Sequence, residues 1–340
     1  MKQNFIKKRK LFLFFLIGLA FLTVIGATSI GSVDISLKKI FAIVFSRLPF
    51  IQNFFPVYAG PDATIILLLR LPRVLFGLVI GIGLAVSGTS MQGTFKNPMA
   101  SPFILGVSSG GALGAAIGIH FELDLFFLPI LAFLIAMNTT FLVFFLGRIR
   151  GKLHIPTLLL GGLAMNFLMS ALFSYVLFLS DTNDTTRILS FIWGSLSGIQ
   201  WIHLYITLPL VFLGFLLVLL YSRDLNVMQT GEESAKQLGV EVERTKIIQI
   251  ITASFIAAVV VSFSGVIGFV GLIMPHTARL IVGPDHKILI PSSALMGGIF
   301  LVWSDTISRS IGIPVGIITG LVGAPFFIFL LVKKRGETGW

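Results

Sequence analysis

RLPRVLFGLVIGIGLAVSGTSMQGTFKNPM, residues 70–99, is the stretch that decides the fold. It begins with two arginines, Arg70 and Arg73, continues through an apolar run rich in small residues, and reaches Asn97-Pro98 where a membrane helix should end. A proline stops or breaks a helix, and in lipid the freed backbone groups must face protein or water. The stretch therefore predicts a membrane-spanning helix with charges at its mouth and a break at its far end.

The composition of the whole chain extends this reading. Hydrophobic residues make up 56% of the 340 residues and charged residues 11%, which is too little polar surface for a soluble globule. The apolar runs are long enough to cross about 30 Å of hydrocarbon as helices, and the alternating pattern of a membrane barrel is not visible. We therefore expect an all-α polytopic membrane protein. The absence of cysteine excludes disulfides and thiolate metal sites.

Apolar runs and their breaks predict ten spans. The first follows the basic run Lys7–Lys10 but lacks a convincing cleavage site, so we expect a retained helix rather than a signal peptide. The eighth is short and broken by Gly268, Gly271 and Pro275. The ten expected spans are 11–30, 64–95, 102–120, 125–147, 156–179, 201–221, 247–265, 270–282, 289–308 and 315–332.

The distribution of basic residues predicts the orientation. With both termini in the cytoplasm, 17 of the 25 Lys and Arg residues fall on inner segments, 7 on outer segments and one within a span. This bias favours an even number of crossings in the cytoplasmic membrane. The same bias, together with contact between basic residues and anionic lipid, accounts for the net charge of +11, so the charge does not indicate nucleic-acid binding. The longest polar insertion, 222–246, is short, so residues 1–340 are expected to form one membrane domain.

Glycines at four-residue spacing predict where helices approach closely, because helix association in lipid depends on small residues. Internal packing is the simple interpretation, and a pore-lining role for one ladder is the alternative. The ladders are Gly77 and Gly81; Gly106, Gly110, Gly114 and Gly118; and Gly312, Gly316 and Gly320.

Several motifs recur in the order of one known family. They are RLPR (70–73), SGTSMQGTFKNPMASPFILGVSSGGALGAAIG (87–118), GEESAKQLGV (231–240), GFVGLIMPHTARL (268–280) and SDTISRSIGIPVG (304–316). With them the chain closely resembles the FecCD-type permeases, the membrane subunits of ABC importers for iron-siderophores, haem and vitamin B12. The resemblance implies a type II importer architecture with about ten membrane helices per subunit. It also implies a second permease copy, two ATP-binding subunits and an extracytoplasmic substrate-binding protein as partners.

Three arginines lie on expected outer segments, against the positive-inside trend: Arg70, Arg73 and Arg309. They could extend to lipid headgroups or pair with Asp62 and Asp305. The resemblance implies another role, in which they grip glutamates on the two lobes of the binding protein. A guanidinium suits that role because it binds carboxylates through two hydrogen bonds and keeps its charge.

The inner loop 222–246 contains a second candidate site. Thr230 and Glu233 have capping-box spacing and Gly239 supplies a stop, which predicts about two turns of helix on the cytoplasmic face. An ordinary amphipathic surface helix is the alternative. The resemblance implies a coupling helix that seats in a groove of the ATPase subunit, with contacts from Gly231, Glu232, Ala235, Leu238 and Gly239.

The third candidate site is the break after the second span. Asn97, Pro98 and Met99 read most simply as an inner turn, because Lys96 beside them also belongs inside. The resemblance implies that Asn97 and Met99 help to close the pathway at its cytoplasmic end. A second gating element would lie near residues 154–157.

Other signals point away from catalysis. The G-x-S-x-G pattern at 106–110 lies in a helix rather than at a strand-turn-helix elbow, and GRIRGK (147–152) lacks phosphate-loop spacing. No metal ligand set has usable spacing, so neither metal nor cofactor is expected in this chain. Few ionisable residues fall within spans, which disfavours an ion-coupled carrier, the alternative from another class. We expect a non-enzymatic, ATPase-driven importer subunit whose first candidate cargo is a ferric siderophore, with vitamin B12, haem and molybdate as alternatives.

Overall fold

The computed structural model describes residues 2–31, 33, 35–46, 60–124, 126–149 and 151–338. Apart from one two-residue hairpin, in which Arg148 pairs with Leu153 and Ile149 with Lys152, its regular elements are helical. They are α1 (Lys2–Ser29), α2 (Leu37–Phe45), α3 (Pro61–Thr64), a π-helical turn (Ile65–Arg70), α4 (Leu71–Phe95), a 3-10 turn (Pro102–Leu105), α5 (Val107–His120), α6 (Phe127–Gly147), β1 (Arg148–Ile149), β2 (Lys152–Leu153), α7 (Ile155–Leu179), α8 (Thr182–Ile192), α9 (Trp201–Leu220), α10 (Ser222–Met228), α11 (Glu232–Gln237), α12 (Val242–Ser264), α13 (Val270–Val282), α14 (His286–Ile311) and α15 (Val315–Thr338).

The all-α prediction is confirmed. Among the described residues, seven helices are long and apolar enough to cross a membrane, and Val270–Val282 and Val315–Phe329 are shorter apolar helices. The expected second span is longer than predicted, because Pro61–Phe95 is one continuous helical stretch of 35 residues. The expected third span is divided: Pro102–Leu105 forms a 3-10 turn, and Gly106 at a φ of 83° turns the chain into the 14-residue α5.

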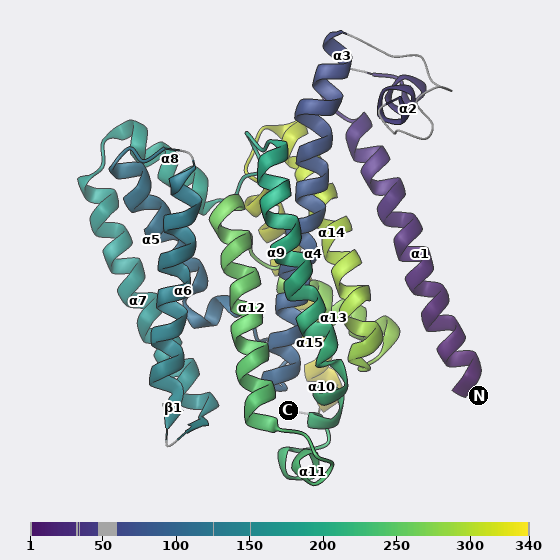
Figure 1. Cartoon of the computed structure of the whole chain (residues 1–340), viewed down its shortest axis with the longest axis vertical. Helices are drawn as coiled ribbons and strands as arrows, with labels where there is room; N and C mark the ends of the chain where they lie inside the picture. Colours follow the sequence, from purple (N-terminus) through teal and green to yellow (C-terminus); the bar gives the residue numbers. More distant parts are fainter. Residues whose placement is uncertain are drawn as a thin grey trace.

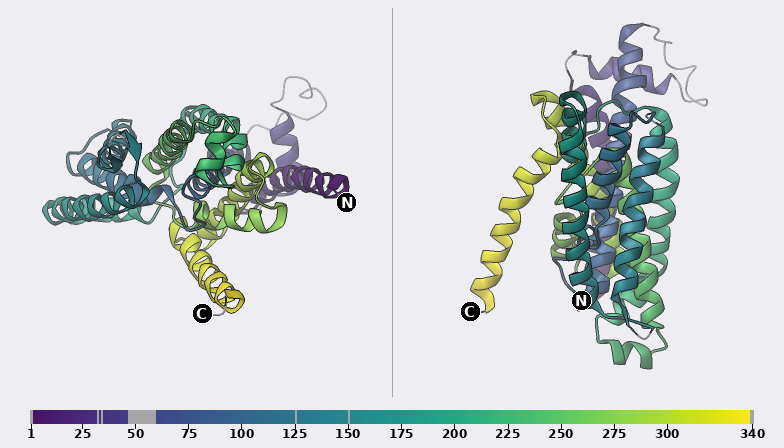
Figure 2. Two further views of the ribbon diagram at one scale, coloured as in Figure 1. Left: turned by 90° about the horizontal axis from the view of Figure 1, so that it is seen from below. Right: turned by 90° about the vertical axis from the view of Figure 1, so that its left-hand side faces the viewer.

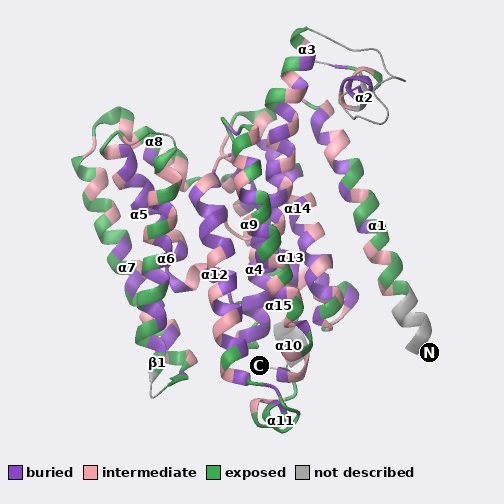
Figure 3. Cartoon of the chain, in the orientation of Figure 1, coloured by how far each residue is buried: buried purple, intermediate pink, exposed green. Residues whose placement is uncertain are grey.

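Helix α4 is the centre of the bundle. It packs against α9, α12, α13 and α14, and burial colouring shows it buried along most of its length (Figures 1 and 3). Glycine pairs make these approaches possible. A Cβ added at Gly81 would overlap the backbone of Gly297 on α14, and one at Gly88 would overlap that of Gly271 on α13. The backbones therefore touch along two seams, as expected for helices that associate through small residues.

Helices α5, α6 and α7, with α8 across one end, form a second group beside this centre (Figure 1). The predicted glycine ladder contributes here, because Gly110 and Gly114 lie against Thr139 and Ala132 of α6. A Cβ added at Gly320, by contrast, would meet no atom within 4 Å. At the periphery, α1 packs mainly on α14, and α15 leans away from the bundle (Figure 2).

The two ends of the bundle differ. Helices α3 and α8 lie at one end, while α11 and the β1–β2 hairpin lie at the other (Figure 1). The first described turn of α1 and the last of α15 both point toward the α11 end (Figures 1 and 2). The chain thus returns to the side from which it started.

Candidate functional site

A cavity of about 890 Å³ opens at the α3 end, and it brings together the three arginines predicted from the sequence. Two come from the π-helical turn and α4, and the third from the end of α14. The lining residues are Ile30, Gly31, Val33, Ile65, Leu69, Arg70, Arg73, Ser190, Ser195, Ser197, Ser308, Arg309, Ser310, Gly312, Ile313 and Pro314.

Arg70 is buried and bonded within the chain. Its guanidinium donates to the carbonyl oxygens of Thr28 (3.2 Å), Ser29 (3.2 Å) and Val33 (2.6 Å). Thr28 and Ser29 end α1, so these bonds satisfy carbonyls that have no partner in that helix. A Cβ at Gly31 would overlap the guanidinium, which explains glycine at this position. Arg70 therefore fastens the end of α1 to the central helix.

Arg73 and Arg309 share one carboxylate. Nε of Arg73 lies 3.0 Å from Oδ2 of Asp305, and a terminal nitrogen lies 2.8 Å from Oδ1, which is the two-bond geometry of a guanidinium with a carboxylate. Nε of Arg309 lies 3.5 Å from Oδ2 of the same residue, and its terminal nitrogen donates to Ala27 O at 2.9 Å. The side chain of Asp305 is only 3% exposed.

Three of the described residues that line the cavity are arginines, and Asp305 pairs with two of them, Arg73 and Arg309. Of the pairings considered from the sequence, the one with Asp305 is confirmed. The one with Asp62 is wrong, because Asp62 pairs with Lys39 of α2. Arg73, 20% exposed, and Arg309, 13% exposed, retain surface toward the cavity.

At the opposite end, the predicted coupling segment contains α11. The expected capping box is wrong: Gly231, at a φ of 125°, precedes the first helical residue, and the Thr230 hydroxyl donates to Val227 O instead. Glu233 pairs with Lys236 at 2.8 Å, and this hydrogen bond lowers the pKa of Glu233 and raises that of Lys236. Both side chains are on the surface.

The stop of α11 and its two faces are clear. Gly239 has a φ of 81° and donates to Lys236 O, so the predicted stop is confirmed. Ala235 is fully buried against Met228, Val240 and Val242. Leu238, in contrast, exposes 65% of its surface. Of the predicted contact residues, Ala235 therefore supports the helix from beneath, and Leu238 is free to contact another protein.

A buried lysine holds α11 to the bundle. Nζ of Lys246, in α12, lies 2.8 Å from Glu232 and 3.3 Å from Glu243, and its side chain is 4% exposed. Glu243 also accepts a hydrogen bond from the backbone N–H of Leu153 at 2.9 Å. One ion cluster thus connects the candidate coupling helix, α12 and the hairpin that precedes α7.

Helix α10 makes a separate connection to α14. The Asn226 amide donates to Asp285 and accepts from the N–H of His286, at 2.7 and 2.8 Å. Gln229 donates to Pro284 O at 3.2 Å and lies 3.0 Å from Nδ1 of His286. The loop 222–246 is therefore fixed on two sides.

The predicted gate residues form a compact turn at the α11 end of α4. Lys96, at a φ of 50°, ends the helix, and the side chain of Asn97 accepts a hydrogen bond from the N–H of Met99 at 2.9 Å. Ala100 is buried next to it, whereas Met99 is 38% exposed. Near the expected second element, His154 contacts the Thr157 hydroxyl at 2.7 Å where α7 begins.

Sequence reasoning missed Lys246 and underrated Asp305. Lys246 could have been noticed as a basic residue three positions after Glu243, the spacing of a helical ion pair. Its burial and its contact with Glu232 had no signal in the sequence, because they depend on how α11 folds back. Helix α8, which was also missed, did have a signal in the sequence: Asp181 is a typical N-cap residue, and it caps the helix by accepting a hydrogen bond from the Asp184 N–H at 2.8 Å.

A model of the FecCD transport family matches residues 18–333. The chain belongs to the FecCD transport family. It is the permease subunit of an ABC importer and a multi-pass membrane protein, and the ATPase partner, not the permease, binds ATP. An importer of this kind also has a binding-protein partner.

Relatives with different named cargoes match this permease. The cobalamin import permease BtuC of Halobacterium salinarum is 44% identical over 270 residues, covering 78% of this chain and 73% of the relative. The hemin transport permease HmuU of Yersinia pestis is 38% identical over 279 residues, covering 79% and 83%. The molybdate import permease MolB of Haemophilus influenzae is 35% identical over 330 residues, covering 94% and 96%.

A solved structure supports the architecture. An inward-facing conformation of a metal-chelate type ABC transporter matches with a TM-score of 0.84 at 32% identity, covering 95% of this chain and 99% of the solved one. The PsaBC structure from Streptococcus pneumoniae matches with a TM-score of 0.58 at 18% identity, which shows likeness of fold alone. The expected importer-permease architecture is thus confirmed.

Proposed function

We propose that the permease imports a bulky metal chelate, with a ferric siderophore as the first cargo to test, after delivery by an extracytoplasmic binding protein. The observation that carries the proposal is the arginine-lined cavity at the α3 end. Arg73 and Arg309 are held there by Asp305 with part of each guanidinium toward the cavity. Acidic side chains of a binding protein would complete this arrangement, because each guanidinium has donors to spare.

The α11 end is the cytoplasmic side in this proposal, and both termini lie there. Leu238 supports docking of an ATPase subunit, because it is an exposed apolar side chain on a helix that is itself packed against the bundle, and such side chains suit the core of an interface. Gly231, Glu232, Ala235 and Gly239 shape and hold the helix, so their contribution to the contact is indirect.

A second copy of the chain completes the transporter. We place the pathway along the interface between the two copies, lined by apolar and small residues. Helix α7 exposes apolar side chains, among them Leu160, Leu163 and Phe167. Helix α15 leans away from the bundle (Figure 2), and both features support a face that a second copy covers. Asn97 and Met99 would then lie near the cytoplasmic end of the pathway, and residues 1–340 would work as one membrane domain.

Uptake by reconstituted vesicles tests the mechanism. Vesicles are prepared with the permease in the membrane and its ATPase on the inner face. They should accumulate labelled cargo only when ATP is enclosed in the vesicle and the binding protein is added outside. Uptake that follows an imposed proton or sodium gradient without ATP would instead support the alternative, an ion-coupled secondary transporter.

The cargo requires its own measurement, because relatives with cobalamin, hemin and molybdate in their names have similar identities. Calorimetric titration of the binding protein with a ferric siderophore, cobalamin, haem and molybdate compares the four directly. Submicromolar affinity for the siderophore alone supports the proposal. Preference for one of the other three moves the cargo within the family and leaves the transport mechanism unchanged.

A further inference from the structure

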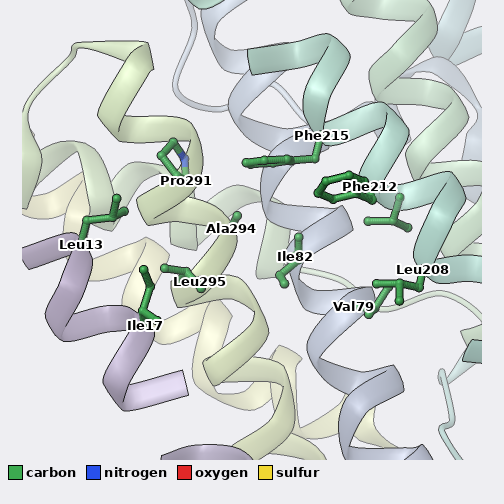
Figure 4. A pocket seen from close by; sticks show the side chains of 11 residues that line it. Leu13, Ile17, Val79, Ile82, Leu208, Phe212, Phe215, Pro291, Ala294 and Leu295 are labelled. Atoms are coloured by element: carbon green, nitrogen blue, oxygen red, sulfur yellow. The ribbon is translucent and has the colours of Figure 1, made fainter. Parts of the chain in front are cut away.

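An apolar groove of about 270 Å³ lies between α1, α4, α9 and α14 (Figure 4). It is separate from the cavity at the α3 end and from the loop 222–246. Its lining is entirely hydrophobic: Leu13, Ile17, Val79, Ile82, Leu208, Val211, Phe212, Phe215, Pro291, Ala294 and Leu295.

The groove opens toward lipid. Ile17, Leu208 and Phe212, which form its rim, each expose about half of their surface. All four helices around the groove are long and apolar enough to cross a membrane. Water has no polar partner there, and an unfilled void would lose dispersion contacts. Hydrocarbon is therefore the matching occupant.

Basic side chains stand at the α11 end of two of these helices. Lys287 lies one turn before Pro291 and two turns before Leu295 on α14, so the three share a face. On α1, Lys10 lies three residues before Leu13 and seven before Ile17, which is again one face. Both lysines are exposed.

We infer that this groove is a binding site for one anionic phospholipid from the leaflet on the α11 side. One acyl chain fills the groove, and the phosphate lies between Lys10 and Lys287. The nearest acidic residue in sequence, Asp285, accepts hydrogen bonds from the Asn226 side chain at 2.7 Å and from the Lys287 backbone N–H at 3.1 Å, so its carboxylate is bonded toward α10 and the start of α14. The lipid would join the peripheral α1 to α14 and α9, and this role does not depend on the cargo or on ATP.

Photocrosslinking tests the site. The full transporter is placed in nanodiscs of phosphatidylcholine and phosphatidylglycerol, each in turn carrying a photoreactive group at mid-chain, and crosslinked peptides are identified by mass spectrometry. Phosphatidylglycerol should label peptides of α1, α9 and α14 around the groove. In the double variant Lys10→Gln/Lys287→Gln this labelling should fall by about fivefold for each lysine lost, the equivalent of about 1 kcal/mol of headgroup attraction per basic residue.

Two controls make the result decisive. Arg148→Gln/Lys152→Gln removes two exposed charges at the same end of the molecule, on the hairpin, and should leave labelling unchanged. Ile17→Trp fills the groove from a half-exposed position that tolerates the larger side chain, and it should reduce labelling by both lipids. Equal phosphatidylglycerol labelling in the parent and the lysine variant, or full groove labelling in Ile17→Trp, would overturn the inference.

Discussion

The cavity at the α3 end contains three arginines, Arg70, Arg73 and Arg309, and their hydrogen-bond partners differ. Arg70 donates to three carbonyls at or just beyond the end of α1, Arg73 is bound by both oxygens of Asp305, and Arg309 pairs with Asp305 and donates to Ala27 O of α1. A guanidinium with three backbone partners is a structural group, and removing it would leave buried carbonyls unsatisfied. Arg70 is thus the most deeply buried of the three, while Arg73 and Arg309 keep part of their surface toward the cavity.

This difference gives a prediction for the outer face. Arg73→Glu/Arg309→Glu, combined with Asp305→Asn so that no buried carboxylate loses its partners, should weaken capture of the binding protein by at least about tenfold, because like charges then meet at the contact. Added salt should weaken capture by the parent. Arg70→Gln should instead lower the thermal unfolding temperature of the permease in detergent. Surface plasmon resonance on the purified transporter measures the first effect and calorimetry the second.

Arg187→Gln is the matched control, because Arg187 is an exposed arginine on α8 that pairs with Asp184. It should alter neither capture nor stability. Capture unchanged in the Arg73/Arg309 variant, with normal unfolding, would show that the binding protein docks elsewhere.

At the scale of elements, α11 is involved in two kinds of ion pair, one with the buried Lys246 of α12 and one with its own exposed Lys236. Lys246 is buried between Glu232 and Glu243, whereas Lys236 and Glu233 form an exposed pair. Losing one partner of a buried ion pair costs up to about 3–5 kcal/mol, whereas water and salt screen an exposed pair such as Lys236 and Glu233. We expect Lys246→Met to loosen α11 and to leave ATP hydrolysis running without uptake, and Lys236→Gln to behave as the parent.

The ratio of cargo imported to ATP hydrolysed in vesicles measures this effect. Lys246→Arg should restore much of the ratio, since it keeps the charge. A normal ratio in Lys246→Met would show that the cluster between α11, α12 and the hairpin does not transmit the movement of the ATPase.

Leu238 and Gly239 provide a second prediction for the same element. Leu238→Ala should weaken ATPase binding without changing the stability of the isolated permease, because its side chain has little packing to lose. Gly239→Val should do both, since a β-branched residue is strained at a φ of 81°. Co-purification of the ATPase subunit and thermal unfolding separate the two outcomes. Full ATPase retention in both variants would make the loop an ordinary surface feature.

The elements also show what the sequence could foretell. The helix 270–282 was predicted to the residue although its glycines and proline break the apolar run, and it was the family resemblance that favoured it; Gly283 ends the helix at a φ of 82°. The capping box at Thr230 failed because Gly231 takes a backbone conformation that delays the helix start. The partners of Arg70, Asp305 and Lys246 could not be predicted, since each lies on an element remote in sequence or orientation, and only packing brings them together.

At the scale of the whole molecule, the gate prediction concerns two copies of the chain. If Asn97 and Met99 lie at the dimer axis, Met99→Cys should crosslink between subunits, with a yield that depends on nucleotide. The chain has no cysteine to interfere, and a disulfide forms readily only when the two Cα atoms lie within about 7 Å. Gel electrophoresis without reductant reports the yield. If neither Met99→Cys nor Asn97→Cys forms a crosslink in any nucleotide state, the turn does not lie at the dimer axis and only connects two helices.

The central position of α4 has a consequence for how the cell makes the protein. Ser87 donates to Ala253 O and Ser90 to Gln249, which follow 166 and 159 residues later, and Gln92 donates to Leu272 O, 180 residues later. During synthesis, α4 therefore enters the membrane long before the partners of its polar side chains exist. A side chain such as Gln92 is costly in hydrocarbon without a partner, so we expect α4 to stay beside the insertion machinery until α12 and α13 arrive. Chains that stop before α12 should accordingly be degraded rather than persist as smaller bundles.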